Sequence, residues 1–149
     1  MKVKNITVVG YSGHSYLCIE TLISLGIDVQ GYYEIEEKLI NPYKLQFLGN
    51  EEHIKTEHHP FISIGNNTIR KKVYHKLRNK KVSLDVNILH PSAIISNTAI
   101  IGEQTFVSSG VIINPQVLIS EGCIINTGAI IEHECRVGSF THIGPGAVL

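Results

Sequence analysis

The sequence is poor in several residue types that point to particular classes of protein. It has no tryptophan, one methionine and only three cysteines, Cys18, Cys123 and Cys135. An odd, scattered set of cysteines predicts neither a disulfide framework nor a paired zinc motif, so we predict no metal site. Charged residues make up 17% of the chain and the formal net charge is zero, which argues against a nucleic-acid partner.

Long apolar runs are also missing. No run approaches the roughly 18 residues that a membrane span needs, and no charged-then-apolar leader opens the chain. We therefore expect neither secretion nor membrane insertion, and the cytoplasm as the location. The length of 149 residues suits one or two small domains.

The second part of the chain has a fixed six-residue period. An aliphatic side chain recurs at Leu89, Ile95, Ile101, Val107, Ile113, Ile119, Ile125, Ile131, Val137, Ile143 and Leu149. A mostly small residue stands two positions before each, as at Ala93, Ala99 and Ala129. Strand side chains alternate faces, so both classes point inward, the residue between them points outward, and the remaining positions turn a corner. This period predicts a three-sided parallel β-helix.

The outward positions of these repeats are unexpectedly apolar. Sorted by stacking every third repeat, they form rows such as Ile94, Ile112 and Ile130 on one side and Ile100 and Leu118 on another. Contiguous apolar rows outside a closed coil usually mark an interface. We predict a homo-oligomer, and specifically a homotrimer.

The first part of the chain has the pattern of a parallel α/β sheet. We expect strands at 5–9, 29–33 and 61–64, a helix that Gly26 ends, and a basic helix over 67–79. Residues 34–60 show little periodicity and are expected to form loops with one short edge strand. We place the domain boundary between 1–87 and 88–149.

Two features of this part could carry chemistry. The turn Gly10-x-x-Gly13-His14 joins a strand to a helix, where backbone amides and the positive helix end favour a phosphate. It lacks the third glycine of the dinucleotide fingerprint, so a nicotinamide cofactor is not expected. Glu34 follows the second strand, where acidic residues of such folds accept hydrogen bonds from a ribose or base. A tight turn and a surface glutamate would explain the same residues.

A sharper cluster falls at a corner of the predicted coil. His133 and Glu134 occupy two turn positions, so the imidazole is expected to project outward. Imidazole is a competent proton acceptor at cellular pH, and an adjacent carboxylate can fix its tautomer. His142 and Arg136 replace apolar residues in nearby outward positions. A charged surface turn is the alternative interpretation.

Three segments resemble one known family. They are Gly10 to His14 (GYSGH), Phe61 to Lys72 (FISIGNNTIRKK) and Asn126 to Cys135 (NTGAIIEHEC). These are similar to segments of the bacterial nucleotide-sugar acetyltransferases of the hexapeptide-repeat, left-handed β-helix superfamily, in particular the bacillosamine-type UDP-amino-sugar N-acetyltransferases, with sialic-acid O-acetyltransferases as cousins. The resemblance implies a Rossmann-like domain that binds a nucleotide sugar, followed by a left-handed parallel β-helix that forms a trimer and binds acetyl-CoA.

The resemblance also assigns roles to individual residues. Ser12, Gly13 and His14 would hold the nucleotide sugar, with Glu34 and Gly65 at its nucleoside end. His133 would be the catalytic base and Glu134 its support, while His142 would contact acetyl-CoA.

The sequence departs from this family in two ways. Family members often have two acidic residues where this chain has Glu34-Ile35, which bears on uridine recognition. They also continue through further coils after the position of Leu149, so we expect a shortened β-helix.

We expect an acetyl-CoA-dependent N-acetyltransferase that acts on the 4-amino group of a nucleotide-linked amino-dideoxy sugar, with UDP as the nucleotide, for bacterial glycan biosynthesis. O-acetylation of a sialic acid or similar sugar is an alternative. A non-catalytic fragment that binds nucleotide sugar and lacks the acetyl-CoA groove is another.

Overall fold

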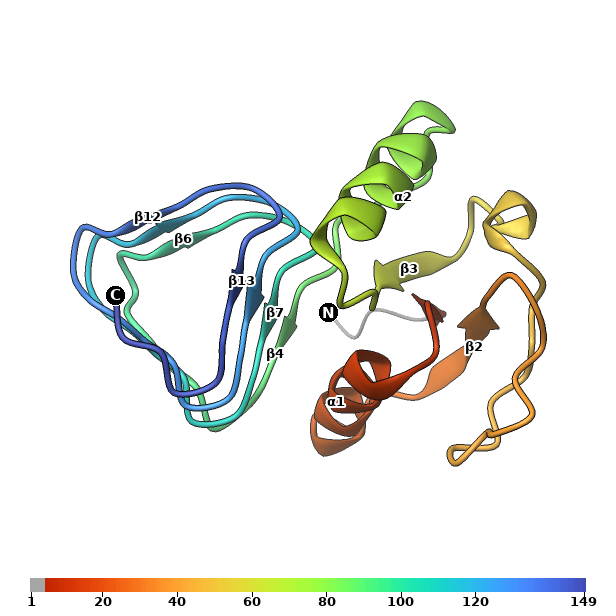
Figure 1. The fold of residues 1–149 in the computed structure, drawn as a ribbon, viewed down its shortest axis with the longest axis horizontal. Helices are drawn as coiled ribbons and strands as arrows, with labels where there is room; N and C mark the ends of the chain where they lie inside the picture. The colour runs from red at the N-terminus through yellow and green to blue at the C-terminus, as the bar shows by residue number, and fades with distance from the viewer. Residues whose placement is uncertain (1–4) are drawn as a thin grey trace. The chain divides into compact units, whose positions relative to one another are not determined.

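The computed structural model describes residues 5–149 and divides the chain into two compact units. The N-terminal unit ends at Val86, and the C-terminal unit comprises Asn87–Leu149. Figure 1 shows a small α/β sheet in the first unit and a triangular coil in the second.

The N-terminal unit is built on three parallel strands, β1 (Ile6–Val9), β2 (Val29–Tyr33) and β3 (His59–Ile62), in the order β2-β1-β3. Helix α1 (Gly13–Ser24) follows β1, and helix α2 (Asn67–Asn79) follows β3. Val8 and Tyr32 of the sheet pack with Ile19 of α1 in one buried cluster. The parallel sheet confirms the predicted fold class of this part.

The third strand begins and ends two residues earlier than the predicted range of 61–64. Its partner β1 ends at Val9, which pairs with Ile62, because Gly10 turns away with a φ of 94°. The residues after Ile62 therefore have no neighbouring strand to pair with. One last hydrogen bond follows, from the Ser63 N–H to Val9 O at 2.9 Å.

The long segment between β2 and β3 is mostly irregular, in agreement with the sequence pattern. Phe47 forms a single parallel bridge with Tyr32, which corresponds to the expected short edge pairing. A short 3₁₀ helix, η1 (Glu51–His53), has no counterpart among the predicted elements. The Asn50 side chain caps it by accepting a hydrogen bond from the Glu52 N–H at 2.9 Å.

The C-terminal unit is a left-handed parallel β-helix (Figure 1). Its ten two-residue strands are β4 (Ile88–Leu89), β5 (Ile94–Ile95), β6 (Ile100–Ile101), β7 (Phe106–Val107), β8 (Ile112–Ile113), β9 (Leu118–Ile119), β10 (Ile124–Ile125), β11 (Ile130–Ile131), β12 (Arg136–Val137) and β13 (His142–Ile143). They form three sheets with orders β13-β10-β7-β4, β11-β8-β5 and β12-β9-β6. Every strand register in this unit joins residues 18 apart, such as Ile124 and His142, so each coil is three hexapeptides long.

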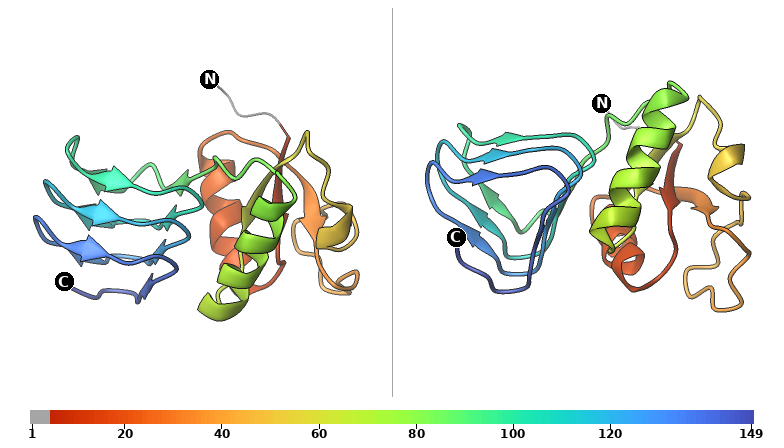
Figure 2. Two further views of the ribbon diagram at one scale, coloured as in Figure 1. Left: turned by 90° about the horizontal axis from the view of Figure 1, so that it is seen from above. Right: turned by 45° about the horizontal axis from the view of Figure 1, so that its top comes forward.

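The predicted ladder fills the interior of this coil. Ile113, Ile125 and Ile131 are fully buried, and the small residues Val111 and Ala129 pack beside them. Figure 2 shows the coils stacked along the axis. The second turn residue of successive corners has a positive φ, at Gln104, Gly110, Gln116, Gly122, Gly128, Glu134, Phe140 and Gly146. The corner geometry thus repeats with the period of the sequence.

Two outward rows of the coil expose large apolar side chains. On the β5-β8-β11 side Ile94 is 66% exposed, and on the β6-β9-β12 side Ile100 is 62% exposed. The corner that carries His133 joins these two sides, since it follows β11 and precedes β12. The apolar rows therefore flank the corner that the sequence singled out.

Candidate active site and nucleotide pocket

The carboxyl ends of the three sheet strands meet at a cavity of about 210 Å³. Val9 and Gly10 line it from the end of β1, Tyr33 and Glu34 from the end of β2, and Ile64 from the segment after β3. This edge is where ligands bind in open parallel α/β sheets. The structure thus brings two predicted features, the Gly10 turn and Glu34, into one cavity.

Gly10 makes this turn possible. Its φ is 94°, and a Cβ atom placed there would lie 2.8 Å from Ile64 Cγ1 and 3.4 Å from the Ser63 carbonyl oxygen. The buried Ser63 hydroxyl lies 2.8 Å from Gly10 O and 3.1 Å from Val9 O, so it can donate a hydrogen bond that stabilises the turn. Only glycine fits this conformation without strain.

Ser12 and Gly13 begin helix α1 and are exposed. Ser12 is the N-cap residue, but its side chain makes no capping hydrogen bond; its carbonyl accepts the first helical bond from the Tyr16 N–H at 3.1 Å. Both residues line a neighbouring cavity of about 440 Å³. Amide groups in the first turn of a helix suit an anionic group. The geometry is compatible with phosphate binding here.

His14 and Gly65 lie apart from these cavity linings. The His14 Nε2 atom is 3.7 Å from the Sγ atom of Cys18, one turn further along α1, and burial raises the pKa of that thiol. A Cβ atom on Gly65 would lie 3.6 Å from His14 Cβ, so these two predicted residues are neighbours. They line neither the 210 Å³ cavity nor the 440 Å³ cavity.

Glu34 is half-buried at the mouth of the 210 Å³ cavity. Its carboxylate Oε2 lies 3.2 Å from Lys38 Nζ, and its backbone N–H donates to Gly49 O at 3.0 Å. The ion pair holds the carboxylate near the cavity, where it can accept hydrogen bonds from hydroxyl or amino groups of a ligand.

Sequence reasoning missed several residues of this region. Glu51 from η1 and Ile69 and Val73 from α2 line the cavity together with Ile35. Arg70, only 2% exposed, donates from Nη1 to the carbonyls of Ile64 at 3.0 Å and Gly65 at 3.1 Å. It thereby fixes the loop after β3. Its position in a basic helix gave no sign of this role, because neighbouring basic residues Lys71 and Lys72 are exposed.

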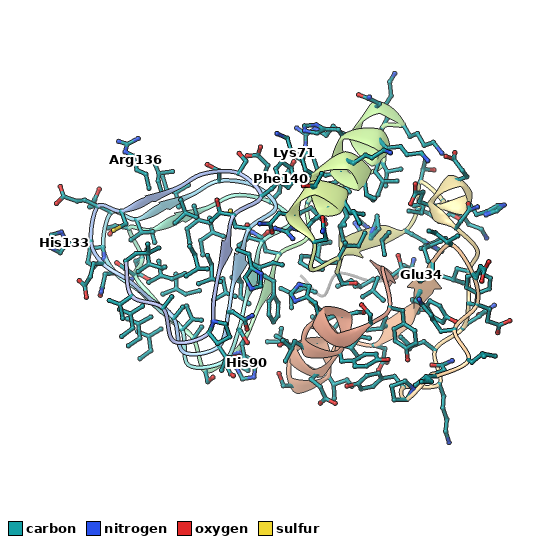
Figure 3. All side chains as sticks on the ribbon, viewed as in Figure 1. Glu34, Lys71, His90, His133, Arg136 and Phe140 are labelled. Atoms are coloured by element: carbon teal, nitrogen blue, oxygen red, sulfur yellow. The ribbon has the colours of Figure 1, made fainter. Side chains whose placement is uncertain are left out.

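The predicted corner of the β-helix places His133 and Glu134 in solvent. Their side chains are 70% and 77% exposed, and His133 Nδ1 lies 3.1 Å from Glu134 Oε2. Figure 3 shows His133 pointing away from the coil interior. The Glu134 N–H donates to Pro115 O of the preceding coil at 3.0 Å, which anchors the corner. With Nδ1–H donated to the carboxylate, Nε2 is left as a proton acceptor.

His142 lies on a different side of the same coil. It is part of β13, which pairs with β10, whereas His133 lies between β11 and β12 of the other two sheets. His142 is exposed, and its Nε2 atom is 3.0 Å from Asn126 Nδ2. A single chain therefore does not bring His133 and His142 into one site.

Two further observations concern residues 5–149. No group of three or more His, Cys, Asp or Glu side chains in this part is arranged to hold a metal ion. Neither helix there has the length and apolar character that crossing a bilayer requires.

The fold defines a class of protein, in which a small parallel α/β domain with a cavity at the carboxyl ends of its strands is followed by a left-handed β-helix. Comparison with known families agrees with this class. Residues 5–77 match the PglD N-terminal domain family.

Several solved structures match nearly all of the chain. The acetyltransferase domain of PglB from Neisseria gonorrhoeae, in complex with acetyl coenzyme A, matches with a TM-score of 0.88 and 25% identity over 97% of this chain and 72% of that one. PerB from Caulobacter crescentus, in complex with CoA and GDP-perosamine, matches with a TM-score of 0.85 and 32% identity over 97% of this chain and 70% of that one. A histidine-to-alanine mutant of GDP-perosamine N-acetyltransferase from the same organism matches similarly, with 31% identity. The chain belongs to this family of nucleotide-sugar acetyltransferases.

Proposed function

We propose that the protein transfers the acetyl group of acetyl-CoA to the 4-amino group of a nucleotide-linked amino-dideoxy sugar, as a step of bacterial glycan biosynthesis. The observation that carries this proposal is the His133–Glu134 pair, with 3.1 Å between Nδ1 and Oε2, at an exposed corner of the coil. Similar proteins bind acetyl-CoA, or CoA together with GDP-perosamine.

In the proposed reaction the sugar amine attacks the thioester carbonyl carbon. His133 Nε2 takes the proton that the amine nitrogen loses, while the C–S bond breaks and CoA leaves as the thiolate. Glu134 accepts the Nδ1–H bond, which holds the imidazole in the required tautomer. The products are the sugar amide and CoA.

The N-terminal unit would bind the nucleotide part of the sugar substrate. In this proposal Ser12 and Gly13 meet the phosphates at the start of α1 with His14 beside them, and Gly65 lies at the nucleoside end. Glu34 accepts hydrogen bonds from the nucleoside at the 210 Å³ cavity. UDP is the nucleotide expected from the sequence, but a similar enzyme binds GDP-perosamine, so both nucleotides belong in the test.

We also propose that the working enzyme is a homotrimer. The apolar rows that contain Ile94 and Ile100 flank the His133 corner, and burial of such rows against a second copy removes them from water. His133 and His142 lie on different sides of one coil, so a site that uses both takes them from two copies. In that site His142 would contact acetyl-CoA.

The test measures CoA release with nucleotide-linked 4-amino sugars, carried on UDP or GDP, and with the matching 4-hydroxy sugars. We expect turnover with an amino sugar, and a loss of about 10²- to 10⁴-fold in kcat on replacing His133 by Ala. The exposed His75 on α2 supplies the matched control, His75→Ala, which should keep full activity. Full activity of His133→Ala would exclude the role of His133, and preference for the hydroxyl acceptors would favour O-acetylation.

A further inference from the structure

A larger cavity in the N-terminal unit takes no part in the proposed function. It has a volume of about 620 Å³ and lies beside β2 and the loop that precedes β3. Its lining consists of Gln30, Tyr33, Gln46, Leu48, Gly49, His53, Lys55 and His58. None of these residues is acidic, whereas His53, Lys55 and His58 all carry nitrogen donors. The lining as a whole therefore favours an anion.

The buried Tyr33 fixes the tautomer of His58. Tyr33 Oη lies 2.8 Å from His58 Nδ1, and it also accepts a hydrogen bond from the backbone N–H of Lys55. Burial raises the pKa of Tyr33, so the phenol keeps its proton at neutral pH. Within residues 5–149 that proton has no acceptor other than His58 Nδ1. His58 therefore carries its own proton on Nε2 and acts there as a donor.

His53 has the same tautomer as His58, with its proton on Nε2. Its Nδ1 atom accepts a hydrogen bond from the Asn50 backbone N–H at 3.3 Å, which leaves the proton on Nε2. A Cβ atom on Gly49 would lie 2.7 Å from His53 Nδ1, and the φ of Gly49 is 97°. Only a glycine at position 49 allows the His53 imidazole to lie this close to the backbone.

Lys55 supplies an unpaired positive charge to this cavity. Lys38, Lys76 and Lys80 all lie in ion pairs with glutamates. Lys55 forms no ion pair with any residue of 5–149, and the nearby exposed Glu57 does not line the cavity. A cation in a cavity whose lining has two imidazole N–H donors and no carboxylate is an arrangement that an anion stabilises.

We propose that this cavity is a second ligand site, which binds the phosphoryl group of a small phosphorylated molecule through His53, Lys55 and His58. A phosphoryl group has three acceptor oxygens, which match three donors that come from separate positions of the chain. A carboxylate carries a single negative charge and has both of its oxygens in one plane, so it suits donors that come from three directions less well. The volume of about 620 Å³ holds more than the phosphoryl group alone, so the rest of the ligand fits beside Gln30 and Gln46.

The test is isothermal titration of the protein with inorganic phosphate, with acetate as the planar anion for comparison. We expect one phosphate per chain that is not displaced by saturating UDP, GDP or nucleotide sugar, and weaker binding of acetate. Lys55→Gln should weaken phosphate binding by about tenfold or more, because it removes the positive charge of the lysine. His58→Gln should weaken it as well. Neither change should alter the affinity for nucleotide sugar, which separates this site from the proposed catalytic function.

The control is Lys44→Gln, a change of an exposed lysine that does not line the cavity. Because Lys55 is exposed, its replacement should leave the fold intact. The phosphate titration of Lys55→Gln therefore tests the site even if His58→Gln is unstable. The proposal is wrong if millimolar phosphate does not bind, if UDP displaces it, or if Lys55→Gln and Lys44→Gln bind it equally well.

Discussion

His133 and Glu134 form a pair across adjacent turn residues, with Nδ1 and Oε2 3.1 Å apart and with Glu134 in the left-handed region at a φ of 63°. That backbone conformation recurs at the second turn residue of neighbouring corners, as at Gln116 and Gly128. The pair therefore uses a geometry that the coil supplies repeatedly, and only the side chains are particular to this corner.

The first prediction concerns the role of this carboxylate. Glu134→Gln keeps an oxygen that can accept the Nδ1–H bond, whereas Glu134→Ala removes the acceptor. We expect the alanine variant to lose more of kcat than the glutamine variant, and both to lose less than the roughly 10²- to 10⁴-fold expected for His133→Ala. Steady-state CoA release measures this order. The neighbouring Glu132 is exposed and offers the control Glu132→Gln, and equal kcat values for the two glutamine variants would contradict the assignment.

A second prediction separates folding from nucleotide binding at the start of α1. Gly10→Ala places a Cβ atom 2.8 Å from Ile64 in a residue with positive φ, and should lower the free energy of unfolding by about 1–3 kcal/mol. A Cβ atom on Gly13 would meet no atom within 4 Å, so Gly13→Ala should leave stability unchanged or raise it by up to about 1 kcal/mol. Thermal unfolding and titration with UDP or GDP measure the two effects. The added methyl group obstructs the approach of the phosphates to the backbone amides, so nucleotide affinity should fall in both variants. Undiminished affinity in Gly13→Ala would show that the phosphates bind elsewhere.

The third prediction tests the assembly. Ile100 is 62% exposed in one chain, and Ile100→Glu should dissociate the proposed trimer because it places a charge in the apolar row. Light scattering at micromolar concentration reports the mass. Ile23→Glu on α1, where the isoleucine is 54% exposed, is the matched control and should stay trimeric. A monomeric parent protein, or an unchanged trimer in Ile100→Glu, would contradict the proposal.

A fourth prediction concerns pH. Hydrogen bonds from Lys76 and Lys80 lower the pKa of Glu52 from 4.5 to about 2. A carboxyl group with a depressed pKa in the folded state stabilises the fold above its ordinary value, and this contribution is lost as the pH falls from about 4.5 toward 2. Nuclear magnetic resonance titration should find Glu52 still ionised near pH 3, and Lys76→Ala should move its pKa back up. An ordinary pKa for Glu52 in the parent protein would show that the ion pairs do not persist in solution.

The β-helix is the most predictable part of the molecule. Each hexapeptide repeats the same three features, which are an inward aliphatic residue, an inward small residue and a corner. The successive repeats reinforce one another and fix the register that joins Ile124 to His142. The helix at Asn67–Asn79 also has its predicted bounds, because its apolar residues share one face.

The cavity at the carboxyl ends of the sheet strands is only partly predictable. Gly10 and Glu34 follow strands and can be placed at the sheet edge, but Glu51 reaches the cavity through a 3₁₀ helix in a segment without periodicity. The role of Arg70 depends on loop carbonyls that no local pattern reveals. His133 and His142 are close in sequence, yet nine residues are half of the 18-residue coil, so the fold places them on different sides.

The most direct test of the central claim is a rate measurement of acetyl transfer by the protein from radiolabelled acetyl-CoA to a nucleotide-linked 4-amino sugar, followed by isolation of the labelled sugar. The account predicts that label appears as an amide on the sugar nitrogen and that His133→Ala abolishes most of the transfer. Label on a sugar hydroxyl, or equal transfer by the parent protein and His133→Ala, would contradict it.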